Sequence, residues 1–142
     1  MPWLSDERID RDALVQSVLR DSDGAVALFE GVVRNRHEGH DVESIFYECY
    51  RPMAEKEIDR IVRTVSGRHP EVRSTLVHRL GEIRVGEASI VIVCVSPHRA
   101  DAFAACRELI DEVKRTVPIW KKERTPEGEI WVGMQNAPGE KI

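Results

Sequence analysis

Two lysines near the end of the chain have the positions that most suggest chemistry. Lys114 closes a segment with helical periodicity, and Lys121 lies in the extended segment that follows Pro118. At about 100° per residue, Lys114 falls at the border between the apolar face of that helix and solvent. Strand alternation places Lys121 on the same face as Ile119 and Glu123. A helix-end lysine and a strand lysine can converge across the turn on a small anionic ligand.

Two other places offer a third cation. Arg34 ends the apolar segment "ALFEGVVR" and begins a polar loop, where the preceding strand would hold its backbone rigidly. His98 and Arg99 stand where an apolar strand gives way to a helix, whose N-terminus presents free N–H groups to an anion. Simpler roles remain open. Lys114 can compensate a helix dipole, and Arg34 can form a surface ion pair. His98 and Arg99 can cap the helix or form a local salt bridge.

The opposite face of the strand "IWKKERT" carries Trp120, Lys122 and Arg124. On that face the lysine and arginine can be solvated or can stack on the indole ring. An aromatic residue interleaved with cations also raises the possibility of nucleic-acid binding. The patch is short, however, and the formal charge of the whole chain is −4. We therefore expect no nucleic-acid partner.

Residues that could bind a metal are few in the sequence. His37 and His40 lie three residues apart in the polar loop 34–41, but no third ligand stands beside them, so we predict no metal site. The three cysteines, Cys49, Cys94 and Cys106, have neither disulfide-framework nor zinc-knuckle spacing. We expect no cofactor.

The 142 residues, 42% of them hydrophobic and 32% charged, predict one globular domain spanning 1–142. No apolar run approaches the roughly 18 residues of a membrane span, and the first residues do not have the pattern of a signal peptide. We therefore expect a cytoplasmic protein without a membrane partner.

The elements that position the cations alternate irregularly between helix and strand. Helices are predicted over 13–20, 52–67 and 97–115, and strands within 1–10 and over 24–33, 42–49, 72–80 and 88–96. The strand 88–96 is apolar on both faces and belongs at the centre of a covered sheet. A hairpin with a "TPEG" turn closes the chain. This order indicates an α+β fold, with helices on one face of a mixed sheet and a hairpin apart from it.

Four ordered blocks carry a resemblance to a known family: "GAVALFEGVVRNRHEG", "YECYRPMAEKEIDRI", "HRLGEIRVGEASIVIVCVSPHRADAF" and "IDEVKRTVPIWKKERTPEGEIWV". From about Gly24 to Val132 the chain resembles the catalytic (large) subunit of molybdopterin synthase, the MoaE family. The resemblance implies an α/β hammerhead-type sandwich of a mixed and antiparallel sheet with a small β-hairpin subdomain.

The resemblance also implies a sulfurtransferase of molybdenum cofactor biosynthesis. Such a subunit forms a homodimer within a heterotetramer and binds a small ubiquitin-like sulfur carrier whose C-terminal Gly-Gly ends in a thiocarboxylate. Two sulfurs pass to cyclic pyranopterin monophosphate, forming the dithiolene of molybdopterin. Since the carrier supplies the sulfur, no cysteine nucleophile is required. A noncatalytic adaptor that binds a ubiquitin-like protein is the alternative.

By position, the resemblance makes Lys114 and Lys121 the catalytic residues. It implies a carrier-tail pocket of Phe29, Arg34 and Ile119, with His98 and Arg99 reaching the site from the neighbouring subunit. The substrate-binding set that it implies is Val32, Val33, Arg34, His98, Arg99, Lys114, Lys121, Lys122 and Glu123. The chain departs from some relatives at Val32, where they carry a lysine.

Overall fold

The computed structural model describes residues 3–132, and its larger sheet has four strands. Their order is β1 (Leu4–Ser5), β6 (Arg73–Arg79), β8 (Ala88–Ser96) and β2 (Ala25–Val32). The pair β1–β6 is parallel and the other two pairs are antiparallel. The sheet is therefore mixed, as predicted, and the apolar strand β8 lies in its interior with both faces covered.

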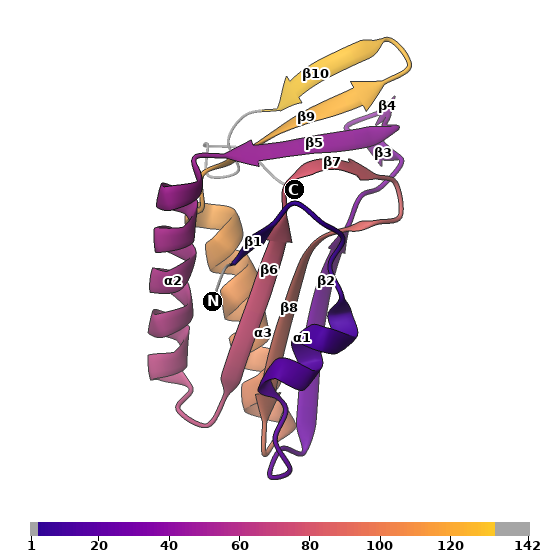
Figure 1. Cartoon of the computed structure of the whole chain (residues 1–142). Helices are drawn as coiled ribbons and strands as arrows, with labels where there is room; N and C mark the ends of the chain where they lie inside the picture. The colour runs from indigo at the N-terminus through magenta and orange to yellow at the C-terminus, as the bar shows by residue number, and fades with distance from the viewer. Residues whose placement is uncertain (1–2, 133–142) are drawn as a thin grey trace.

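Two long helices pack on one face of this sheet and a short helix packs on the other (Figure 1). Helices α2 (Arg51–Arg68) and α3 (Arg99–Thr116) bury Ile58, Ile61 and Leu109 in the main core. Helix α1 (Arg11–Val18) instead packs Val18 against Val91, Val93 and Val95 of β8. The sequence prediction placed the helices on one face. The second face needs its own cover because β8 is apolar on both sides.

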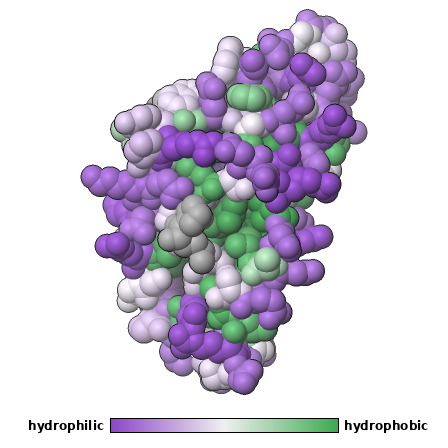
Figure 2. Space-filling model, viewed as in Figure 1, coloured by the Kyte–Doolittle hydropathy of each residue, from purple (hydrophilic) through white to green (hydrophobic). Residues whose placement is uncertain are grey.

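The short helix covers only part of its sheet face. Val26 and Leu28 of β2 alternate with the core residues Ala27 and Phe29 and remain 47% and 38% exposed. Figure 2 shows hydrophobic side chains gathered across the middle of this view of the molecule. No helix in the described part of the chain has both the length and the apolar character needed to cross a bilayer.

A second, antiparallel sheet crosses one end of the first (Figure 1). Its order is β10 (Gly128–Val132), β9 (Ile119–Thr125), β5 (Ser44–Cys49) and β7 (Gly81–Arg84). The predicted closing hairpin is β9–β10, which lies apart from the larger sheet as expected. Strands β5 and β7 extend it to four strands, and β7 was not predicted. Within the predicted loop 34–41, β3 (Arg36–His37) and β4 (His40–Asp41) form a small hairpin.

Substitution of two glycines by alanine is expected to change stability in opposite directions. A Cβ atom on Gly24 would lie 2.6 Å from the carbonyl oxygen of Pro97, whereas one on Gly67, in α2, meets nothing within 4 Å. We expect Gly24→Ala to lower the free energy of unfolding by about 1–3 kcal/mol, because backbone must move. Gly67→Ala should raise it by up to about 1 kcal/mol. Urea unfolding of both variants checks this, and equal midpoints would contradict it.

Candidate functional site

A cavity of about 270 Å³ lies where the two sheets and the end of α3 meet. Its apolar lining includes Phe29, Val42, Ile45 and Ile90, and its cationic lining includes Arg34, Lys114 and Lys121. Three of the cations that the sequence singled out thus share one cavity, although they come from separate parts of the chain.

Lys114 reaches the cavity from the last turn of α3, where it is half-buried. Burial lowers the pKa of its ammonium, and the nearby Arg34 guanidinium lowers that pKa further, while Asp111 acts in the opposite direction. A lysine with a depressed pKa exchanges protons more readily near neutral pH than a solvated one does. The site therefore has a cation that can also act in proton transfer.

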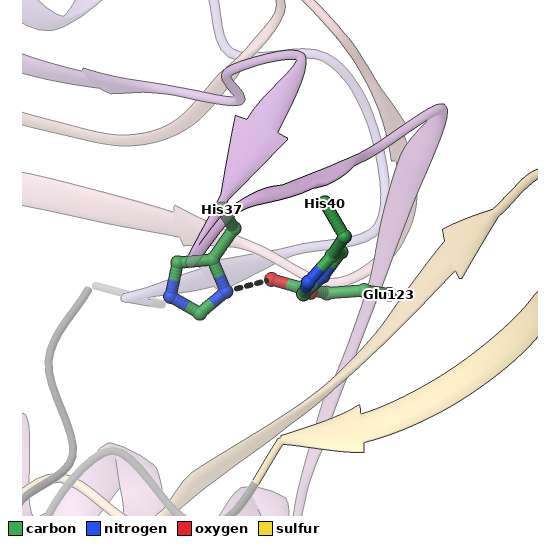
Figure 3. Close-up of side chains that lie close together, drawn as sticks. All are labelled: His37, His40 and Glu123. Carbon is green, nitrogen blue, oxygen red and sulfur yellow. Dashed lines mark hydrogen bonds and ion pairs between the residues drawn. The ribbon is translucent and has the colours of Figure 1, made fainter.

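Lys121 and Glu123 lie two residues apart on the inward face of β9. Only 3% of Lys121 and none of Glu123 is exposed, and Ile119 on the same face is also fully buried. The alternation predicted from the sequence is confirmed here. A fully buried carboxylate is costly unless it is paired, and His37 and His40 of the β3–β4 hairpin both contact Glu123 (Figure 3).

The end of β2 supplies the next part of the cavity wall. Its register with β8 shifts between Gly31 and Val32, which is a β-bulge. Such a bulge bends a strand and changes the direction of the side chains after it. Val32, Val33 and Arg34 follow directly, and all three line the cavity. The backbone N–H of Val33 donates to the carbonyl of Glu87, which fixes this segment.

Tyr47 and His78 form a buried polar part of the wall, with their rings in edge contact at 5.1 Å. Burial raises the pKa of Tyr47 to about 12 and lowers the pKa of His78 to about 4. His78 Nδ1 lies 2.8 Å from the carbonyl oxygen of Arg79, so this nitrogen carries the proton and donates. Both side chains are thus neutral at physiological pH.

The buried imidazole of His78 predicts a pH dependence of stability. The unfolded chain binds a proton at this histidine below about pH 6.5, whereas the folded chain does so only near pH 4. Stability is therefore fully present above pH 6.5 and falls by roughly 3 kcal/mol as the pH drops to about 4. His78→Asn should flatten this loss. Urea unfolding of wild type and variant across that range measures the difference, and parallel curves would contradict the prediction.

Several predicted site residues lie away from the cavity of the same chain. His98 is the N-cap residue of α3, but its side chain makes no capping hydrogen bond, and Arg99 lies about 22 Å along the helix axis from Lys114. Ile119 is fully buried and is not part of the cavity lining. Lys122 points to the outer face of the smaller sheet, where its ammonium lies 5.1 Å from the ring centroid of Trp131. The roles assigned to these four residues stay predictions.

The aromatic partners of Lys122 differ from the one suggested by the sequence. Its ammonium lies over Phe46 as well as Trp131, whereas stacking on Trp120 was considered. It also pairs with the carboxylate of Glu129 at 3.4 Å. Lys121 and Lys122 thus face opposite sides of β9 and do not form one basic patch.

Sequence reasoning missed the arrangement of the histidines around Glu123. It found no third ligand beside His37 and His40, but the structure supplies one from a strand far along the chain. Gly39, between the two histidines, was a local sequence signal for part of this arrangement. Glu38 and Gly39 both have positive φ, at 48° and 84°, as in the two-residue turn of a tight hairpin. Such a turn sets the flanking histidines opposite each other.

The two-sheet α+β architecture and the cation-lined cavity define a hammerhead-type fold with a site suited to anionic ligands. A family model described as "MoaE protein" matches residues 4–116. The molybdopterin synthase catalytic subunit of Pyrococcus abyssi is 45% identical over 120 residues, which are 84% of this chain and 79% of that protein. The chain belongs to the MoaE family.

Solved structures agree with this assignment. Molybdopterin synthase from Staphylococcus aureus is 35% identical to this chain with a TM-score of 0.87. The match covers 92% of this chain and 95% of the Staphylococcus aureus chain. A Helicobacter pylori complex of subunits 1 and 2 of molybdopterin-converting factor contains a chain with a TM-score of 0.74 and 18% identity. That match covers 91% of this chain and 88% of the other, and it supports the fold. The resemblance predicted from the sequence is confirmed.

Proposed function

We propose that this chain is the catalytic subunit of a molybdopterin synthase and transfers sulfur from a thiocarboxylated carrier protein to cyclic pyranopterin monophosphate. The observation that carries the proposal is the convergence of Lys114, Lys121 and Arg34 on one partly apolar cavity. The names of the relatives point to the same activity.

The charges of the two reactants explain why cations are needed. A thiocarboxylate and a phosphate-bearing pterin are both anionic, so bringing them within reacting distance is unfavourable without fixed positive groups. An apolar wall strengthens each charge contact because it lowers the local dielectric. The cavity combines both features.

We assign Lys114 to the reacting centre. Attack of the carrier sulfur on a pterin side-chain carbon forms a carbon–sulfur bond as the carbon–oxygen bond at that carbon breaks, with the oxygen leaving as water or on the phosphate. The carrier is then joined to the pterin through a thioester. Water then cleaves the bond between the acyl carbon and sulfur, which releases the carrier carboxylate and leaves the sulfur on the pterin. The tetrahedral oxyanion of that cleavage is stabilised by a held ammonium. Lys121 and Arg34 orient the carrier tail and the substrate.

We assign His98 and Arg99 to the phosphate of a substrate bound in a neighbouring copy of the chain. Their position at the N-terminus of α3 suits an anion, because free N–H groups and the helix dipole add to the arginine charge. The length of α3 supports their separation from Lys114 of the same chain. In a homodimer within a heterotetramer, His98 and Arg99 can bind the phosphate in the neighbouring subunit's site while remaining far from Lys114 of their own chain.

The test is direct. The purified chain is incubated with a thiocarboxylated small subunit and cyclic pyranopterin monophosphate, and dithiolene formation is followed. The proposal requires product that depends on this chain. Carrier binding without product in this assay would overturn it and favour the alternative of a noncatalytic adaptor.

A further inference from the structure

Three side chains with metal-binding atoms converge beside the cavity. His37 and His40 face each other across the β3–β4 hairpin, and Glu123 reaches them from β9 (Figure 3). The Nδ1 atom of His37 lies 2.6 Å from Glu123 Oε2, and the Nε2 atom of His40 lies 2.6 Å from Oε1. One ligand atom from each residue falls within 4.8 Å of the others.

Direct contact does not satisfy all of these atoms. The contact of His40 with Glu123 has hydrogen-bond geometry, but His37 Nδ1 and Glu123 Oε2 are buried and form no hydrogen bond despite their short separation. Buried polar atoms in proteins almost always have a hydrogen-bonding partner, whereas these two atoms have only their close contact with each other. A cation between them satisfies both, because imidazole nitrogen and carboxylate oxygen each offer it a lone pair.

We propose that His37, His40 and Glu123 form a binding site for a divalent transition metal of the Zn²⁺ type. Two imidazole nitrogens and one carboxylate oxygen suit zinc or a similar ion, whereas calcium and magnesium prefer oxygen ligands alone. Three protein ligands leave one tetrahedral position open. Because His37 and Glu123 also line the cavity, the proposed site borders the same space as Lys121.

The two histidine–glutamate separations need only a small adjustment. Zinc bonds of about 2.0–2.1 Å at tetrahedral angles separate two ligand atoms by roughly 3.3 Å, about 0.7 Å more than the present contacts. The β3–β4 hairpin is short, and it carries both histidines, so a slight outward movement of it widens both contacts together. The other nitrogen of His37, Nε2, lies 3.8 Å from the exposed Glu38 carboxylate, which is longer than a hydrogen bond.

Metal titration of tag-free protein tests the site. After removal of metals with a chelator, the protein is titrated with Zn²⁺ by calorimetry and with Co²⁺ by visible absorption. We expect one equivalent to bind and Co²⁺ to give the intense bands of a four-coordinate ion. His37→Gln, His40→Gln and Glu123→Gln should each weaken binding by at least about 30-fold. His69→Gln is the matched control, since His69 pairs with Glu108 outside the cavity.

Two results would overturn the site: no saturable binding by the wild-type chain, or binding that His40→Gln leaves unchanged. His40 is partly exposed on a surface hairpin, so its variant should fold, and thermal unfolding of the metal-free proteins checks this. Zn²⁺ should raise the melting temperature of wild type but not of His40→Gln, because the ion joins the hairpin to β9. These measurements do not use sulfur transfer, so they are independent of the proposed function.

Discussion

Lys114→Ala is expected to lower the rate constant of dithiolene formation by at least about 100-fold, the effect of removing a group that stabilises an oxyanion. The ammonium of Lys114 is half-buried in the cavity, and water that replaces it does not supply a fixed charge. Carrier affinity should change little, because one side chain contributes a small part of a protein interface. Single-turnover assays and carrier titration measure the two quantities separately.

Lys56→Ala is the matched control for this substitution, because Lys56 is an exposed lysine on α2. It should leave both the rate constant and the carrier affinity at wild-type values. Retained turnover in Lys114→Ala would end the catalytic assignment. A loss of carrier binding equal to the loss of rate would instead make Lys114 a docking residue.

Mixed dimers of two inactive variants are expected to regain activity. Consider a dimer of one Lys114→Ala chain and one Arg99→Ala chain in which each active site uses Lys114 of one chain and Arg99 of the other. One active site then contains both substitutions, and the other contains neither. With random pairing, half of the dimers are mixed and each has one intact site, which predicts about a quarter of wild-type activity. Lys114 lies 15 residues after Arg99 along α3, and this separation supports the arrangement.

Co-expression of differently tagged variants, followed by two affinity steps, isolates the mixed dimer. That species alone should have about half of the wild-type activity. Lys114→Ala paired with Lys121→Ala is the control, because both lysines line the cavity of their own chain and each cavity of this mixed dimer therefore carries one substitution. Neither site of the control dimer is intact, so it should stay inactive whether or not Arg99 acts across the subunits. Equal activity in the two mixed dimers would contradict the shared site.

Local patterns predicted the orientation of the cations, and tertiary pairing decided their partners. Strand alternation placed Lys121 inward and Lys122 outward, as the structure has them. The aromatic neighbours of Lys122 depend on register, since it pairs with Phe46 of β5 on one side and Trp131 of β10 on the other. The sequence "IWKKERT" alone does not determine the register of β9 with its neighbours, so stacking on the nearby Trp120 was the interpretation considered.

The same limit explains the missed histidine cluster. His40 and Glu123 are 83 residues apart, and they meet because β5 pairs with β9 while the β3–β4 hairpin precedes β5 directly. The helix 13–20 was predicted, but its placement on the second sheet face was missed for a different reason. The apolar pattern of β8 predicts that both of its faces are buried, but it does not indicate which helix packs on which face.

The position of β9 between β5 and β10 lets neighbouring residues be varied for separate purposes. Odd-numbered positions from Ile119 to Thr125 are buried, while Lys122 and Arg124 reach the outer surface. Charge reversal at an even-numbered position therefore reports on macromolecular contacts, and conservative change at an odd-numbered one reports on the interior chemistry. One strand of seven residues thus provides two independent sets of probes.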